Sequence, residues 1–157
     1  MKTLITNADV VTLAFGDGEY LSAEVVLESD IAVAEERYIR PIVGEGLYAR
    51  LLDGDYDTLR TDYVAPALAM AVRTMIQPSL NVRTGQAGLS ISASLRSDSS
   101  TKSAVEGLQR SLVRRRRALC RRLSNYLSNH ASEFPEYDRD CDALQHCVID
   151  GGYIQTC

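Results

Sequence analysis

The stretch "AEERYIRPIVGEGLYARLL", residues 34–52, decides the fold, because it begins as a helix and then meets a proline and two glycines. Pro41 has no amide hydrogen to bond back to Arg37, so a helix kinks or ends there. Gly44 and Gly46 then permit a change of direction. We therefore expect two helical pieces that meet at a bend and cover a core at different angles.

Helical periodicity extends on both sides of this bend. A short helix is predicted after a cap at Thr6 or Asn7, and a longer one after a cap at Ser29. A third helix is expected over residues 56–78, with Pro66 as a candidate kink and Pro78 as its end. The last helix is expected from about residue 101 to 130, where leucines recur at the helical spacing.

Residues 79–100 differ in character, because "LNVR" and "LSISASL" alternate apolar and polar residues around "TGQAG". The predicted fold class is thus mainly α: a small helical bundle with a kinked helix and a protruding β-hairpin or irregular loop. We expect a single domain over residues 1–157, with a helical core at about 3–130. Residues 131–157 are then a C-terminal extension that contains a turn, a short helix and an extended tail.

Composition is that of a soluble globular chain, with 45% hydrophobic and 24% charged residues among 157. No apolar run approaches the roughly 20 residues of a membrane span. Asn7 and Asp9 interrupt the apolar core that a signal peptide would need. The four cysteines are interpreted as free thiols. We expect a protein assembled in a cytosol, with no membrane partner.

Charge is unevenly distributed along the chain. Residues 101–125 hold eight basic residues and one acid, Glu106, which gives +7. Because the whole chain carries −4, the remainder carries −11. Such polarity suits nucleic acid, an acidic partner or another copy of the same protein.

The arginines of "LVRRRRALCRRL" surround most of the last predicted helix. Arg114, Arg117 and Arg121 lie on the side opposite Leu112, whereas three further arginines flank the apolar stripe. A nucleic-acid helix usually gathers its cations on one face. The pattern therefore favours arginines that cover the core and pair with acids elsewhere. Protein–protein contact ranks second and nucleic-acid proximity third.

No motif predicts a metal site or a catalytic centre. "DGDYD", residues 53–57, begins like a calcium loop, but Thr58 and Val64 stand where glycine and glutamate are required. The spacing of Cys141, His146 and Cys147 matches no paired zinc arrangement. Hydrolase, phosphate-loop and zinc-protease signatures are missing from the sequence. We expect no cofactor, no metal and no enzyme activity.

The order of these features resembles the head–tail connector (adaptor, or head-completion) proteins of tailed phages and prophages. The resemblance is carried by "ITNADV", "AEERYIRPIVGEGLY", "YVAPALAMAVRTMIQPSL", the irregular segment and the arginine-rich helix, over roughly residues 3–130. It implies a structural protein of the virion neck, assembled in the bacterial host cytoplasm. Copies would form a ring that contacts portal and tail or stopper proteins, and DNA would pass through without sequence-specific binding.

Within that family the irregular segment would be the protruding element. Its basic residues Arg83, Arg96 and Lys102 then join Arg114, Arg117 and Arg121 as interaction residues. Two other classes remain open. One is a cytosolic nucleic-acid-binding or regulatory helical protein that uses the arginine-rich helix, and the other is a helical enzyme whose site is assembled from distant residues.

Overall fold

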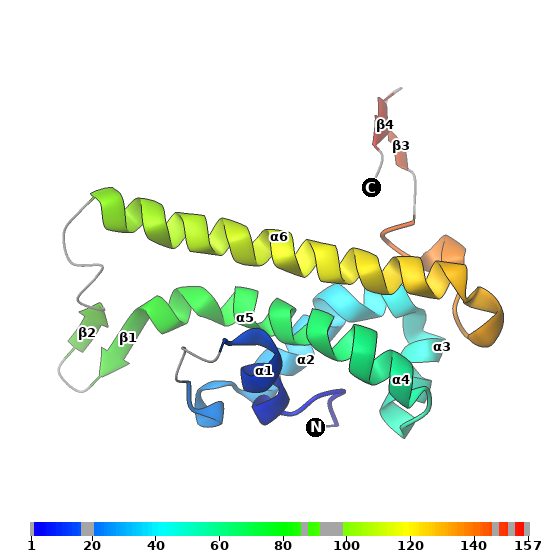
Figure 1. The fold of residues 1–157 in the computed structure, drawn as a ribbon, viewed down its shortest axis with the longest axis horizontal. Helices are drawn as coiled ribbons and strands as arrows, with labels where there is room; N and C mark the ends of the chain where they lie inside the picture. The colour runs from blue at the N-terminus through cyan, green and yellow to red at the C-terminus, as the bar shows by residue number, and fades with distance from the viewer. Residues whose placement is uncertain are drawn as a thin grey trace.

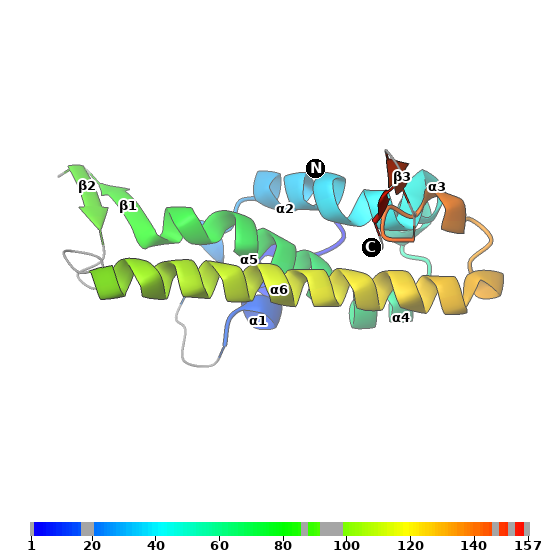
Figure 2. The same cartoon turned by 90° about the horizontal axis from the view of Figure 1, so that it is seen from above.

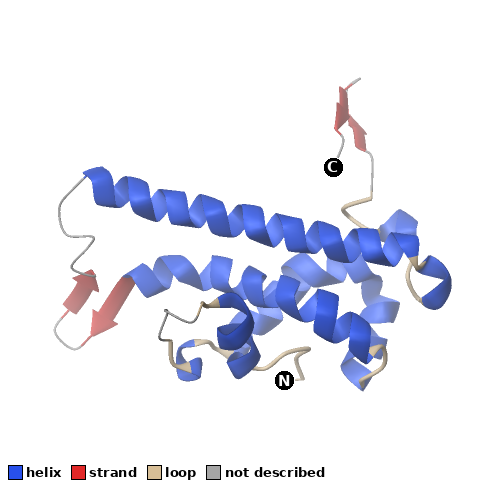
Figure 3. Ribbon diagram, in the orientation of Figure 1, coloured by secondary structure: helices blue, strands red, loops and turns tan. Residues whose placement is uncertain are grey.

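The computed structural model describes residues 2–16, 21–85, 88–91, 99–145, 148–150 and 153–155. The fold is mainly α-helical, as the sequence predicts (Figure 3). None of the described helices has the length and hydropathy that crossing a membrane requires.

The N-terminal third forms three α-helices and two shorter helical turns. They are α1 (Asn7–Ala14), the 3₁₀ turn η1 (Ala23–Val25), α2 (Glu28–Ala34), the π-helical turn η2 (Glu35–Ile39) and α3 (Arg40–Asp53). The predicted cap of α1 is confirmed at Thr6, whose side chain accepts from the Asp9 amide while the Asp9 carboxylate accepts from the Thr6 amide. The cap predicted at Ser29 is wrong, because Leu27 is the N-cap, two residues earlier, and α2 begins at Glu28.

The bend predicted at Pro41 occurs three residues later. One π turn precedes Pro41 and closes with the Arg40 amide bonded to the Glu35 carbonyl. Pro41 then stands in the first turn of α3, where its missing amide hydrogen leaves no helical bond unmade. The break falls at Gly44, with φ 74° and ψ 166°, a conformation that side chains other than hydrogen rarely allow.

A second helix repeats this construction. It consists of α4 (Asp57–Leu59), the π turn η3 (Arg60–Val64) and α5 (Ala65–Asn81). Pro66 again follows a π turn, so its ring enters the first turn of α5. The predicted helix end at Pro78 is wrong, because α5 continues to Asn81. Pro78 cannot donate to the Thr74 carbonyl, and the Gln109 side chain donates to that oxygen instead, at 3.0 Å.

The remaining elements are a long helix, two strand pairs and two short turns. Strands β1 (Val82–Gly85) and β2 (Gly88–Ile91) pair antiparallel after α5, and α6 (Ser99–Asn129) follows. The segment 79–100 was predicted to contain no helix, but its first residues belong to the end of α5 and its last residues to the start of α6. The 3₁₀ turns η5 (Ala131–Glu133) and η6 (Arg139–Cys141) precede the antiparallel pair β3 (Val148–Asp150) and β4 (Tyr153–Gln155).

Helix α5 is the centre of the molecule. α6 runs along one side of it and α1 along the other, while α2 packs beside it (Figures 1 and 2). The fully buried side chains of α5 include Leu68 and Met70, and those of α6 include Leu123 and Leu127. The strand pair β1–β2 extends α5 at one end of the molecule, and β3–β4 projects away from the other end (Figure 1).

Candidate interaction groove

Two short sequence repeats build the surface that faces α6. "YIRP" at residues 38–41 and "YVAP" at 63–66 each place a tyrosine inside a π turn, followed by a proline in the first turn of the next helix. Because a π turn inserts an extra residue, it rotates the side chains that follow relative to those before it. Both tyrosines contact arginines of α6, so the two turns form matched docking points for that helix.

Tyr38 lies between two arginines. The Arg116 guanidinium lies 4.3 Å from the centre of the Tyr38 ring and donates a hydrogen bond of 3.0 Å to its hydroxyl. The Arg37 guanidinium lies 5.5 Å from the same ring. A half-buried tyrosine that attracts cations by its ring face and accepts from one of them fixes the arginine geometry here.

Tyr63 contacts the C-terminal part of α6. The Arg122 guanidinium lies 4.8 Å from its ring centre, and the Tyr126 ring stacks on it at 3.9 Å. His130 extends the stack, with its ring 4.3 Å from that of Tyr126. This aromatic column and the Tyr38 contact together set the position of α6 along the π turns.

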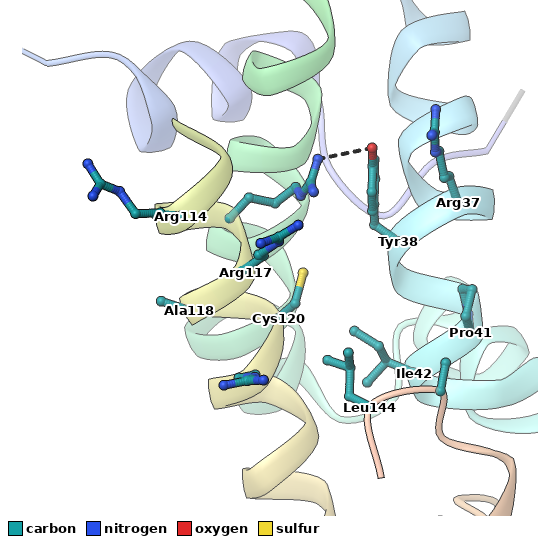
Figure 4. A pocket seen from close by; sticks show the side chains of 12 residues that line it. Arg37, Tyr38, Pro41, Ile42, Arg114, Arg117, Ala118, Cys120 and Leu144 are labelled. Atoms are coloured by element: carbon teal, nitrogen blue, oxygen red, sulfur yellow. Dashed lines mark hydrogen bonds between the residues drawn. The ribbon is translucent and has the colours of Figure 1, made fainter. Parts of the chain in front are cut away.

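A groove of about 710 Å³ opens between α6 and the helices on either side of Pro41. Figure 4 shows Arg117 and Cys120 projecting from α6 into the groove opposite Tyr38 and Ile42. Five arginines line it, namely Arg37, Arg114, Arg116, Arg117 and Arg121. The other lining residues are Tyr38, Pro41, Ile42, Ala118, Cys120, Ala143 and Leu144. None of the described carboxylates lines the groove, so the described surface is basic with an apolar floor.

The arginines named from the sequence take a different arrangement from the one expected. Arg114, Arg117 and Arg121 are exposed and all line this groove, and Arg116 joins them. Among the residues whose side chains the structure describes, none of these four forms a salt bridge, whereas Arg110 pairs with Glu106. The expectation that they pair with acids elsewhere is wrong for this part of the chain. The angular positions of residues along α6 describe that helix alone. The opposite side of the groove, which includes Arg37, is formed by the π turn η2.

A second, smaller groove of about 420 Å³ lies nearer the N-terminus of α6 and shares Arg114 and Arg117 with the first groove. Figure 4 shows Arg114 pointing outward on the other side of α6 from Arg117. The basic surface therefore continues over α6 rather than ending at the groove rim.

Three predicted interaction residues lie apart from this groove or outside the described part. Arg83 belongs to β1 and Lys102 to the first turns of α6, and the structure describes the backbone but not the side chain of each. Arg96 lies outside the described residues. The structure therefore brings together three of the six.

The C-terminal segment closes one end of the groove. The Ala143 amide donates to the Pro41 carbonyl at 2.9 Å, which ties residues 143–144 to α3. Asp142 is fully buried and accepts from the Ser124 hydroxyl at 2.6 Å, the Tyr137 hydroxyl at 2.8 Å and the Leu144 amide at 2.8 Å. Burial and the Asp142 carboxylate raise the pKa of Tyr137 well above its usual value.

From the sequence, the cysteines are interpreted as free thiols, and no metal site is expected at Cys141, His146 and Cys147. Cys120, on the groove floor, and Cys141 are free thiols, and burial raises the pKa of the Cys120 thiol. No three of the described histidines, cysteines and carboxylates gather as metal ligands would. His146 and Cys147 of the weighed metal site lie outside the described residues, as does Cys157.

Sequence reasoning missed Tyr38, Arg37 and Arg116 as parts of this site. The signal that could have found them is the repeated tyrosine–β-branched–any–proline pattern, which marks two equivalent turns. The burial of Glu35 was not predicted from the sequence either. It is 2% exposed and accepts from the Leu4 amide and the Tyr48 hydroxyl, both at 2.7 Å.

Comparison with known proteins identifies one relationship. Residues 29–145, well over half of the chain, match a family of unknown function, DUF6712. Every residue that lines the basic groove falls inside this range. No curated protein and no solved structure matches the chain.

Proposed function

We propose that this chain, which belongs to the DUF6712 family, is a structural subunit of a phage or prophage neck. In this role it is a head–tail connector: copies form a ring between the portal and the tail or stopper proteins. The resemblance given above suggests the role, and the basic groove on α6 is the observation that supports it best. Ring subunits need a surface that attracts a different surface of the next copy, and the groove supplies one such surface.

The physical argument rests on uncompensated charge. Five arginines converge on one groove, and no carboxylate is among the described residues that line it. Like charges this close repel one another, and the apolar floor lowers the local dielectric and strengthens their field. An acidic occupant removes that repulsion, so the groove is better suited to docking than to remaining empty. The same chain carries −11 outside residues 101–125, which makes a second copy an available occupant.

The first experiment tests assembly with a matched pair of variants. Arg117 and Arg115 are both exposed on α6, but Arg117 lines the groove and Arg115 does not. We expect Arg117→Glu to abolish ring formation seen by negative-stain microscopy and mass photometry, and Arg115→Glu to retain it. The monomer should stay folded in both, because surface changes usually cost about 0.5 kcal/mol or less. Equal loss in both variants would mean that net charge, and not the groove, controls assembly.

The second experiment tests the neck assignment itself. The gene should lie beside portal, terminase and tail genes, and the purified protein should co-sediment with the portal protein encoded there. A gene in an unrelated context, together with no binding to that portal protein, would contradict the connector role even if the protein forms rings.

The runner-up function is nucleic-acid binding, which the exposed arginines of α6 favour. A protein that binds DNA through them would bind duplex at moderate salt, and its affinity would fall steeply as salt rises. We expect weak binding or none by the free protomer, because its net charge of −4 opposes approach to DNA. A salt-dependent affinity of about 1 μM or tighter in a gel-shift titration would replace the connector proposal.

A further inference from the structure

The first helices of this chain carry acidic residues without neighbouring basic ones. Residues 3–36 contain eight acids and no lysine or arginine. The segment includes α1, η1 and α2, and the chain's next basic residue, Arg37, already belongs to the groove. Charge is therefore divided by position in the fold as well as by position in the sequence.

Exposed apolar side chains gather in the same segment. Five large hydrophobic residues of the described chain are exposed, and four of them lie here: Leu13 at 40%, Val25 at 41%, Leu27 at 57% and Val33 at 51%. We define the acidic face as the exposed residues of α1, η1 and the start of α2, namely Asp9, Leu13, Glu24, Val25, Leu27 and Glu28. It is thus both acidic and apolar.

The acidic face and the basic groove lie on different sides of the molecule. α1 packs along one side of α5 and α6 along the other, and the first residues of α2 are separated from Arg37 of the groove by the length of that helix (Figures 1 and 2). The two surfaces are complementary in charge, and both contain apolar side chains. The groove offers arginines around an apolar floor, and the acidic face offers carboxylates around exposed apolar side chains.

We propose that the acidic face of one copy docks into the basic groove of a second copy. Leu27, with Val25 beside it, enters against the groove floor, and Glu24 and Glu28 meet the arginines of α6. Because the two surfaces differ and lie on opposite sides of α5, the contact is head-to-tail and repeats from copy to copy. This inference rests on the proposed function only in requiring that copies assemble, and its tests use no portal protein.

The decisive test uses two variants that each remove one of the surfaces. Arg114→Glu/Arg117→Glu lowers the charge of the groove side chains from +5 to +1, and Glu24→Arg/Glu28→Arg changes the charge of the acidic face from −3 to +1. Each variant alone should be monomeric, with self-association at least ~100-fold weaker than that of the wild type. Mixed in equal amounts, they should form dimers and nothing larger, because one intact face meets one intact groove and the two altered surfaces no longer attract each other.

Controls separate this contact from general charge effects and from misfolding. Asp62→Arg/Glu133→Arg makes the same charge change at exposed acids outside the acidic face and should assemble like the wild type. Circular dichroism should show unchanged helix content in every variant. As a measurement that needs no charge reversal, Leu27→Cys and Ala118→Cys chains that lack all four native cysteines, including Cys120 in the groove, should cross-link to each other with a short bismaleimide. Neither chain should cross-link as efficiently with itself.

The outcomes decide between the occupants. Dimers in the mixture and cross-links between positions 27 and 118 support docking of a second copy. Mixed variants that stay monomeric, or a wild-type protein that stays monomeric at about 1 mM, would overturn it, since even weak specific contacts populate complexes at that concentration. Loss of duplex DNA binding in Arg114→Glu/Arg117→Glu, without any mixed dimer, would assign the groove to DNA instead. A head-to-tail contact without portal binding would keep this inference and reject the neck assignment.

Discussion

Glu35 and Glu36 are neighbours in sequence with opposite roles. Glu35 is buried in the π turn η2, where its two oxygens each accept one hydrogen bond, from the Leu4 amide and the Tyr48 hydroxyl. Glu36 is exposed and pairs with Arg40 on the surface. Glu35 therefore connects the segment before α1 and helix α3 to the same turn. Glu36 contributes only an ion pair that solvent screens.

Replacing each glutamate by glutamine separates these roles. In Glu35→Gln one carboxylate oxygen becomes an amide nitrogen, so one of two buried donors loses its acceptor. We expect the free energy of unfolding to fall by about 1–3 kcal/mol. Glu36→Gln should change it by no more than ~0.5 kcal/mol. Urea denaturation followed by circular dichroism measures both, and equal losses would contradict the assigned burial roles.

Tyr48 predicts how stability responds to alkaline pH. Burial, and then the Glu35 carboxylate, raise the pKa of its hydroxyl to about 12. The unfolded chain would ionise this group near pH ~10, so its contribution is complete below that pH and is lost as pH rises to about 12. The wild type should thus lose stability over this range. Tyr48→Phe should be less stable at pH 9, and the gap should narrow by pH 12. A gap that stays constant would show that Tyr48 does not titrate with folding.

At the scale of elements, Gly44 determines where the first long helix breaks. Its φ of 74° and ψ of 166° suit glycine alone, and no other heavy atom lies within 4 Å of where a Cβ would stand. Gly44→Ala should therefore destabilise the fold through the backbone only, by about 1–3 kcal/mol. Gly107 lies inside α6 with equally open space and a helical conformation. Gly107→Ala should stabilise by about 0.5–1 kcal/mol. Thermal unfolding of the two variants should shift in opposite directions.

The long-range bond between α5 and α6 should behave as a coupled pair. Gln109 donates to the Thr74 carbonyl, the oxygen that Pro78 leaves without its helical donor. Gln109→Ala should cost about 1 kcal/mol in the wild type. In a Pro78→Ala background the helix supplies that donor itself, so the cost should fall. The double-mutant cycle should give a coupling free energy of about 0.5–1 kcal/mol. Additive effects of the two changes would contradict the idea that the Gln109 side chain replaces the missing backbone donor at residue 78.

The helices could be predicted from sequence because their apolar periodicity is local. Ile31, Ala34 and Ile42 are buried as their spacing indicates, and the caps and glycines bound most elements within a few residues. The π turns could not be predicted, because the extra residue they insert depends on the tertiary contacts that reward it. Pro41 and Pro66 therefore looked like helix breakers, although each sits where a helix tolerates proline.

At the scale of the whole molecule, the groove was only half visible in the sequence. The arginines of α6 were evident from composition, but their convergence needs Arg37 and Tyr38, which are more than seventy positions away in the chain. Local pattern carries no information about which helix lies opposite another. That these arginines have no carboxylate partner among the described residues is likewise a property of the packed molecule and not of any segment.

Division of charge across α5 also has a kinetic consequence. A molecule with acids on one side and arginines on the other has a large permanent electric dipole. Two such molecules rotate in each other's field before they touch, and a neighbour approaches already oriented. Added salt screens this field beyond about 10 Å at ~0.1 M but leaves close contacts almost unchanged. The association rate constant of copies should therefore fall as salt rises while the dissociation rate constant changes little. Stopped-flow light scattering at several salt concentrations would measure both, and an effect confined to dissociation would mean that the dipole does not guide the encounter.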